Sequence, residues 1–239
     1  MAGGRPGVIV LWQFGPALGL PSASPFCIKA QTWLRLAGLE YEARNALTPR
    51  QAPLAKLPYV EVDGRKIADS GCIVRELSAA RGIDLDTALD ARGRAVAHAC
   101  IRMTEEHLYW AVLYSRWLDP AHWEAMKRSF FAALPAVARG PVAKLVRRKV
   151  ERDARGQGLA LHAPEEIYRR GAADIAALAD LLGERPYMMG AEASTLDASA
   201  YAMLASCWEA QLDTPLKAAV GQHPNLVAYC ARMKLRCFS

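Results

Sequence analysis

The sequence predicts an α/β domain at the N-terminus and an all-α domain after it. Residues 1–82 alternate short β-rich apolar runs with two helical stretches, whereas the residues from Leu85 onward have helical patterns almost throughout. A polar stretch at 81–90 separates these two kinds of sequence. A chain of 239 residues, of which 52% are hydrophobic, is long enough for two modest cores. We therefore expect domains at 1–82 and 90–239.

Caps and turn residues mark the N-terminal elements. Residues 8–14 form a short β-rich run that is typical of a strand covered on both faces. Ser24 can cap a following helix, Pro25 suits its first position and Gly38 ends it. Further strands are expected at 40–47, 59–62 and 66–68, and a second helix at 71–81. The resulting order, β-α-β followed by β-β-α, is that of a thioredoxin-like domain.

The C-terminal part consists of long Ala-, Leu- and Arg-rich stretches with few β-branched runs, which favours helix. Breaks between helices are expected at Asp119-Pro120, Gly140-Pro141, 156–158, 183–190 and His223-Pro224. We therefore expect about six or seven helices in this part of the chain.

The net charge of +6 includes one concentrated basic segment, residues 139–155, with seven basic and two acidic side chains. Val142, Leu145 and Val146 recur there at helical spacing, so we expect an amphipathic helix with a solvated basic face. Because the segment has no aromatic residues on which bases could stack, we expect no nucleic-acid partner. An anionic small substrate would also suit it, and the sequence assigns the segment no definite role.

Other classes of protein are excluded by simple counts. No uninterrupted apolar run approaches the ~18 residues that a membrane helix needs, and the N-terminus has no secretory cleavage pattern, so we expect a cytoplasmic protein without membrane contact. The six cysteines form no C-x-x-C pair and no cluster with histidine. We therefore expect no metal site and six free thiols.

The first chemical motif is Ser24-Pro25-Phe26-Cys27 at the start of the first helix. Thiol-disulfide enzymes of the thioredoxin type carry C-P-x-C at this junction, where the helix N-terminus lowers the pKa of the first cysteine. With Ser24 in its place, the hydroxyl can donate a hydrogen bond to the thiolate of a bound ligand. Lowering a thiol pKa by about two units takes ~2.7 kcal/mol, within reach of one donor and the helix dipole. Alternatively, Ser24 only caps the helix.

The second motif is Lys56-Leu57-Pro58, before the expected strand at 59–62. A cis Leu57-Pro58 bond would free the N–H and C=O of Leu57 to pair with an extended peptide ligand, although an ordinary turn proline is the alternative. Lys56 is either a contact for a ligand carboxylate or a surface lysine.

The third motif is Asp69-Ser70, before the second helix. A hydroxyl and free N–H groups at a helix N-terminus suit a carboxylate, and the neighbouring Asp69 can receive an ammonium. The pair therefore suits an α-amino acid head group, although each residue alone could be a plain helix cap.

Taken in order and followed by an all-helical half, the three motifs resemble those of the cytosolic glutathione S-transferase superfamily over nearly the whole chain. The run Ser194-Thr195-Leu196-Asp197 is similar to the family's buried helix start, with a serine and an aspartate at capping-box spacing. Residues 106–117 and 157–167 resemble the branch typified by failed-axon-connections and metaxin-like proteins.

The resemblance implies a glutathione transferase-like fold, with glutathione as co-substrate and a small hydrophobic electrophile as acceptor in detoxification. It implies that Ser24 hydrogen-bonds the glutathione sulfur. It implies glutathione contacts at Lys56 for the glycine carboxylate, Leu57 and Pro58 for the cysteinyl unit, and Asp69 and Ser70 for the γ-glutamyl group. Many relatives have Glu where this chain has Asp69. Homodimers are usual in the wider family.

Two alternatives belong to the same resemblance. A glutathione-dependent thiol transferase would use Cys27, although by position Cys27 matches the second, usually buried, cysteine of the thioredoxin motif, so Ser24 is preferred. A non-catalytic interaction protein would follow the metaxin-like relatives, which serve in membrane-associated assembly.

The acceptor site is expected between the two domains, where one helix offers a stripe of residues at spacings of three and four. The stripe consists of Met103, His107, Trp110, Tyr114 and Trp117. Trp12 and Phe14, near the end of the first strand, could complete an apolar wall. Alternatively, a stripe of this kind packs in the hydrophobic core of the helical domain. His107 is given no catalytic role.

Overall fold

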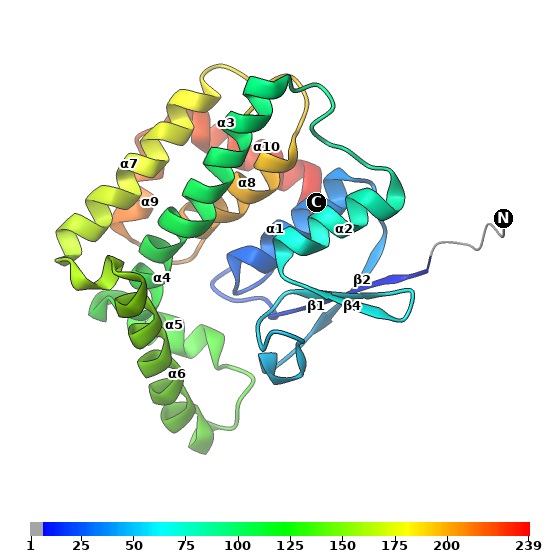
Figure 1. Cartoon of the computed structure of the whole chain (residues 1–239). Coiled ribbons are helices and arrows are strands. Elements are labelled where there is room, and N and C mark those ends of the chain that lie inside the picture. Colours follow the sequence, from blue (N-terminus) through cyan, green and yellow to red (C-terminus); the bar gives the residue numbers. More distant parts are fainter. Residues whose placement is uncertain (1–6) are drawn as a thin grey trace.

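The computed structural model of the chain describes residues 7–239, and its N-terminal part is built around a four-stranded sheet (Figure 1). The strands are β1 (Ile9–Gln13), β2 (Tyr41–Asn45), β3 (Tyr59–Val62) and β4 (Arg65–Ala68). The helices are α1 (Pro25–Leu36), the short 3-10 turn η1 (Pro49–Gln51) and α2 (Ser70–Arg81). The sheet order is β2-β1-β3-β4, with β1 parallel to β2 and antiparallel to β3. This confirms the thioredoxin-like order of elements.

Successive side chains along each strand point to opposite faces of the sheet, and the face with the buried side chains packs against α1 and α2. In the centre of the sheet Leu11 lies opposite Ala43 on one side and Val60 on the other. Leu11 and Val60 are fully buried in a cluster with Trp33 of α1 and Ile73 of α2. Burial of such side chains stabilises the domain by about 1.5–3 kcal/mol each. Packing against the sheet therefore holds α1 and α2, and with them their N-termini, in position.

The rest of the chain is helical, as predicted (Figure 1). Its elements are α3 (Ala91–Arg102), η2 (Met103–Leu108), α4 (Tyr109–Trp117), α5 (Pro120–Phe130), α6 (Ala136–Gln157), η3 (Leu159–Leu161), α7 (Pro164–Leu182), α8 (Thr195–Trp208), α9 (Pro215–Gly221) and α10 (Pro224–Phe238). Residues 91–117 form one continuous helix whose middle segment, η2, is a π-helix. If this continuous helix is counted once, the described residues after the sheet domain form seven α-helices.

One expected helix break is wrong. Gly140-Pro141 lies inside α6, which runs from residue 136 to 157 without interruption. A proline removes the N–H that would bond the carbonyl four residues earlier, here that of Val137. Because Val137 is 88% exposed and lies in the first helical turn, water can hydrate that carbonyl. The proline is therefore tolerated near the start of this helix.

Helix α8 lies at the centre of the helical domain and against α1. It is buried on all sides and starts with the predicted capping box, in which Asp197 Oδ2 accepts hydrogen bonds from the backbone N–H and the hydroxyl of Ser194, both at 2.8 Å. Asp197 Oδ1 accepts from the Met188 N–H at 2.9 Å and the Tyr229 hydroxyl at 3.0 Å. These bonds satisfy the helix start inside the core.

The boundaries 1–82 and 90–239 stay a prediction, and the first six residues of the former lie outside the described part. In that part, α2 ends at Arg81 and α3 begins at Ala91. Among residues 7–239 no helix combines the length and the apolarity that crossing a membrane requires.

Candidate functional site

Ser24 stands at the N-terminus of α1, in the extended conformation of an N-cap with φ −104° and ψ 127°. Its hydroxyl makes no capping hydrogen bond, so the interpretation of Ser24 as only a helix cap is not supported by the geometry. The preceding loop is held by Ser22, whose hydroxyl donates to the Phe14 carbonyl at 2.7 Å. Pro25 occupies the first helical position without an N–H to satisfy. The half-buried Ser24 hydroxyl is thus presented at the positive end of a helix.

Cys27 lies one turn further into α1 and is completely buried. Burial raises the pKa of its thiol from 9.0 to about 11, and hydrogen bonds with the Phe14 backbone and the side chains of Ser22 and Ser24 offset that rise only in part. The thiol is therefore protonated at neutral pH and inaccessible. These properties disfavour Cys27 as a nucleophile.

The loop before β3 carries the second motif. The Leu57-Pro58 peptide bond is cis, as expected, and both residues are buried. Among the described residues neither the N–H nor the C=O of Leu57 has a hydrogen-bond partner. Lys56 is exposed on the same loop. The loop therefore offers one donor, one acceptor and one cation to a ligand.

Asp69 and Ser70 shape the N-terminus of α2. Asp69 has a φ of 75° and a ψ of 130°, a positive-φ conformation outside the left-handed helical region, and its Oδ1 accepts from the N–H groups of Gly71 at 2.8 Å and Cys72 at 3.2 Å. Asp69 Oδ2 has no partner in the part of the chain that the structure describes, and the carboxylate is exposed. Ser70 is 3% exposed at the first helical position. One carboxylate oxygen thus caps the helix while the other is left for a cation.

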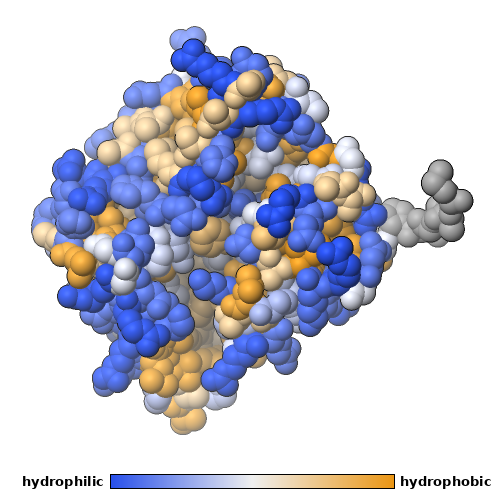
Figure 2. Space-filling model, in the orientation of Figure 1, coloured by the Kyte–Doolittle hydropathy of each residue, from blue (hydrophilic) through white to orange (hydrophobic). Residues whose placement is uncertain are grey.

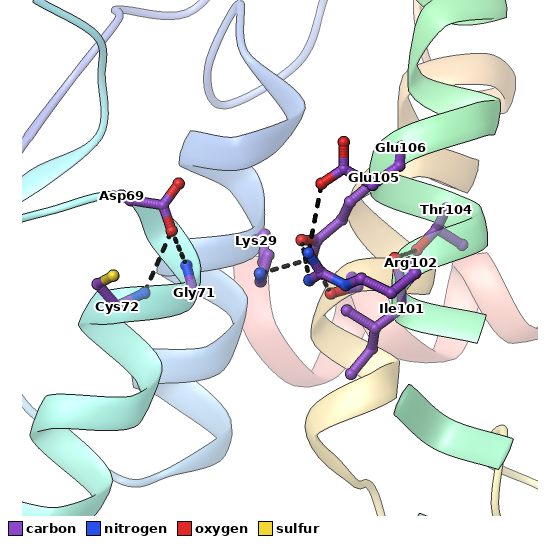
Figure 3. Close-up of polar contacts among 10 residues, drawn as sticks. Lys29, Asp69, Gly71, Cys72, Ile101, Arg102, Thr104, Glu105 and Glu106 are labelled. Carbon is purple, nitrogen blue, oxygen red and sulfur yellow. Dashed lines mark hydrogen bonds and ion pairs between the residues drawn. The ribbon is translucent and has the colours of Figure 1, made fainter. Parts of the chain in front are cut away.

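A buried ion pair, which the sequence analysis missed, joins α1 to the helical domain behind this helix N-terminus (Figure 3). Lys29 Nζ lies 2.5 Å from Glu105 Oε1, which also accepts from the Ser199 hydroxyl at 2.6 Å. Arg102 Nη2 donates to Glu105 Oε2 at 2.8 Å. A Cβ atom added to Gly71 would lie only 4.0 Å from Lys29 Nζ, so the Lys29 charge stands close behind the start of α2. The sequence feature that could have indicated this ion pair is the position of Lys29 on the same helix face as Phe26 and Trp33.

Two further contacts tie the 91–117 helix to the loop and turn around Ser24. The rings of Tyr109 and Phe26 lie 4.8 Å apart, and Arg116 Nη1 donates to the Ala23 carbonyl at 3.2 Å. Arg116 is 3% exposed, and burial lowers its pKa to about 10, which leaves the guanidinium charged at neutral pH. Together with Glu105, these residues form the helix face that meets the sheet domain.

Two residues of the stripe that was predicted to line the acceptor site, His107 and Tyr114, contact α7. His107 Nδ1 lies 2.6 Å from Asp174 Oδ2, and the Tyr114 ring makes an edge contact with Tyr168, so both side chains face α7. Met103 and Trp110 pack against the helical core. His107 and Tyr114 thus have partners on α7, and their role as acceptor contacts stays a prediction. The same helical repeat puts Glu105, Tyr109 and Arg116 on another face of this helix, and that is the face which packs against the sheet domain.

Trp12 and Phe14 lie where β1 leaves the sheet. The Trp12 ring stacks on Tyr59 at 5.9 Å, and its Nε1 is buried without a partner among the described residues. The Phe14 ring contacts Phe130 of α5 at 5.5 Å, which brings it to the boundary of the two domains. Figure 2 shows a hollow between the sheet domain and the lower helices on this side of the molecule. Trp12 and Phe14 therefore stay predicted contacts of an acceptor.

The described residues contain six free cysteines and no group of three or more metal-ligating side chains. The arrangement offers instead a hydroxyl at a helix N-terminus, an open peptide edge at Leu57, and an acidic and a hydroxyl side chain at Asp69 and Ser70. These groups are the kinds that hold a small peptide with a thiol, an α-amino acid head and a carboxylate.

Comparison with known protein families agrees with this geometry. Residues 25–122 match the family "Glutathione S-transferase N-terminal domain", and residues 171–233 match "Glutathione S-transferase, C-terminal domain". The isoprene-epoxide–glutathione S-transferase of Rhodococcus sp. is 31% identical over 95% of this chain and 98% of its own length. The chain belongs to the glutathione S-transferase family.

Other relatives extend the comparison. Failed axon connections of Drosophila melanogaster is 33% identical over 97% of this chain, and the chain spans 58% of that protein's length. Human metaxin-1 is 26% identical over 90% of this chain and 48% of its own length. Among solved structures, a beta-etherase of Sphingobium sp. has a TM-score of 0.65 with 17% identity and 95% coverage of both chains. That likeness shows the fold.

Proposed function

We propose that this protein is a glutathione transferase in which the Ser24 hydroxyl stabilises the thiolate of bound glutathione. The observation that carries the proposal is the Ser24 hydroxyl, which makes no capping bond and stands at the N-terminus of α1 above a protonated Cys27. One hydrogen bond to a charged acceptor contributes about 1.5–3 kcal/mol, which suffices to lower a thiol pKa by about two units.

The same geometry supports the remaining glutathione contacts of the proposal. Leu57 would pair its N–H and C=O with the cysteinyl unit of glutathione, and Lys56 would meet the glycine carboxylate. Ser70 would hold the γ-glutamyl carboxylate, with the Lys29 charge behind it, and Asp69 Oδ2 would receive the γ-glutamyl ammonium. The reaction then needs little beyond a thiolate and proximity.

An epoxide is the electrophile that the Rhodococcus relative suggests. The glutathione thiolate attacks a ring carbon, so that a carbon–sulfur bond forms while one carbon–oxygen bond breaks, and the alkoxide takes a proton from water. Phe14 and Phe130 at the domain boundary offer apolar surface for the carbon skeleton. On the basis of the family resemblance, we propose that the reaction takes place in the cytoplasm, that it serves detoxification and that the enzyme is a homodimer.

Calorimetric titration with glutathione, followed by incubation with glutathione and isoprene monoepoxide and mass analysis of the product, tests the proposal. We expect binding in the micromolar to millimolar range and a product mass equal to the sum of the two reactants. Absence of binding at millimolar glutathione would overturn it. A Ser24→Ala variant should bind glutathione but form product at least about tenfold more slowly.

A second candidate is a non-catalytic interaction protein, favoured by the matches to Failed axon connections and the metaxins, which cover 88% or more of this chain. Purification from cells with a stoichiometric protein partner, together with no product from glutathione and isoprene monoepoxide, would favour this candidate. Thiol transfer through Cys27 is disfavoured by the burial of its thiol and its raised pKa.

A further inference from the structure

A small cavity lies where α4, α8 and α9 meet. Arg116 of α4, Ser206 of α8 and Thr214, the N-cap of α9, contribute to its polar lining. Val112 and Leu216 contribute to its apolar lining. The volume of the cavity is about 10 Å³, which is enough for one water-sized species. An organic ligand is therefore too large for it.

Two polar atoms in the wall of this cavity have no hydrogen-bond partner within residues 7–239. They are the Nε of Arg116 and the hydroxyl of Ser206, and both residues are only 3% exposed. Thr214 Oγ1 accepts from the Lys217 N–H at 3.1 Å, which leaves the hydrogen of this hydroxyl for another acceptor. A buried donor without an acceptor is unfavourable, and native proteins contain few of them. One acceptor inside the cavity can serve these groups together.

Arg116 also brings a buried positive charge that no anionic group of the described residues balances. Its other hydrogen bonds go to neutral carbonyls, from Nη1 to Ala23 at 3.2 Å and from Nη2 to Ser206 at 2.7 Å. The ionisable groups that bear on its pKa are Cys207 and Tyr109. Burial raises the pKa of each of these two groups to about 12, so both are neutral near pH 7. A buried charge of this kind is stabilised by a counter-ion.

A water molecule and a small monovalent anion both match the volume of the cavity, but they differ in what they supply. A water molecule accepts hydrogen bonds and leaves the charge of Arg116 unbalanced. A halide ion accepts hydrogen bonds from several donors at once and also balances that charge. The donors and the charge together therefore favour an anion over water, and the volume restricts the anion to a single atom.

We propose that this cavity binds one halide ion, such as chloride, between the Nε of Arg116 and the hydroxyl of Ser206. The ion connects α4 to α8, because these two residues lie on different helices. It also supports the guanidinium that donates to the carbonyl of Ala23, the residue before Ser24. Binding of the ion does not depend on glutathione.

Thermal unfolding of the full chain without glutathione tests the proposal, with sodium chloride exchanged for sodium gluconate at constant ionic strength. Gluconate is too large for the cavity, so it supplies the salt without the ligand. We expect the midpoint of unfolding to rise by about 3 °C or more when about 0.2 M chloride replaces gluconate, because the ion binds only the folded chain. Equal midpoints in the two salts would show that the cavity holds water and would overturn the proposal.

Crystals grown in bromide instead of chloride locate the ion, because bromide scatters X-rays anomalously. We expect an anomalous peak in contact with Arg116 Nε and Ser206 Oγ. Density at this position without an anomalous signal would identify a water molecule and contradict the proposal.

Matched variants separate the ion from a general salt effect. Ser206→Ala should raise the chloride concentration that gives half of the shift at least about tenfold, because a hydrogen bond to a charged acceptor is lost. Arg116→Met removes the charge and should abolish the shift. Thr32→Val removes a buried hydroxyl of α1 outside the cavity and should keep the full shift. A shift that is unchanged in Ser206→Ala, or that survives in Arg116→Met, contradicts the proposal.

Discussion

Lys29 Nζ lies 2.5 Å from Glu105 Oε1 across the boundary of the sheet domain and the helical domain, and both side chains are at least 94% buried. The pair connects α1, which presents Ser24, to the π-helical segment of the 91–117 helix. π-helical turns often occur at functional sites. The contact makes the position of the candidate site depend on the packing of both domains.

The first prediction concerns this ion pair. Removal of one buried partner, in Lys29→Met or Glu105→Gln, should lower the free energy of unfolding by about 3–5 kcal/mol, because the other group stays buried without compensation. The double variant should cost less than the sum of the two single variants. Urea unfolding followed by circular dichroism measures all three.

An exposed ion pair provides the control. Lys149 and Asp153 are paired on α6 with side chains 61% and 39% exposed, so Lys149→Met should change the free energy of unfolding by at most about 1 kcal/mol. If Lys29→Met costs no more than Lys149→Met, the buried pair does not stabilise the domain boundary.

The second prediction concerns thiol reactivity. Because burial raises the pKa of Cys27 to about 11, iodoacetamide should leave Cys27 unmodified in the native protein near neutral pH while the half-buried Cys72 reacts. The raised pKa stabilises the fold fully below pH 9.0, the unfolded value, and this contribution is lost as the pH rises through about 11. Mass spectrometry of tryptic peptides measures the labelling. Equal labelling of both cysteines would contradict the burial of Cys27.

The third prediction separates the two oxygens of Asp69. Asn at this position keeps the capping oxygen and tolerates the positive φ, but it lacks the charge for an ammonium. Asp69→Asn should therefore weaken glutathione binding about tenfold or more while changing the free energy of unfolding by less than about 0.5 kcal/mol. A glutathione analogue without the γ-glutamyl amino group serves as the control ligand. It should bind the wild type and the variant alike, and an unequal effect would place the ammonium elsewhere.

The fourth prediction concerns close helix packing. A Cβ atom at Gly171 of α7 would lie 2.7 Å from Leu216 Cδ2 and 3.0 Å from Ala111 Cβ, so Gly171→Ala should destabilise the protein by about 1–3 kcal/mol. Gly156 of α6 has no atom within 4 Å of such a Cβ, so Gly156→Ala should stabilise by up to about 1 kcal/mol through helix propensity. Thermal unfolding measures both. Shifts of the same sign would show that the Gly171 contact is not tight.

The order of elements could be predicted from the sequence because it is encoded locally. Pro25 at a helix start, Gly82 at a helix end and the Asp63-Gly64 turn each specify a backbone conformation that few residues adopt, and the structure has all three. The three motifs could be placed for the same reason, since each stands at the start of a helix or strand.

The face that the 91–117 helix turns to the sheet domain could not be predicted. A 3.6-residue repeat places His107 and Tyr114 on one face of this helix and Glu105 and Tyr109 on another, but it does not say which of the two faces packs against α1. Only the partner of Lys29, 76 residues away along the chain, fixes that register. A contact between residues so far apart along the chain leaves no pattern in the local sequence.

The pKa of the glutathione thiol in the bound state, measured from the ultraviolet absorbance of the thiolate as a function of pH, tests the central claim most directly. We predict that glutathione bound to the wild type titrates about two units below its value in solution. In Ser24→Ala at saturating glutathione the pKa should return most of the way to the solution value, while Cys27→Ala should leave it lowered. A bound thiol that keeps its solution pKa, or one whose lowered pKa survives Ser24→Ala, would contradict the assignment of Ser24.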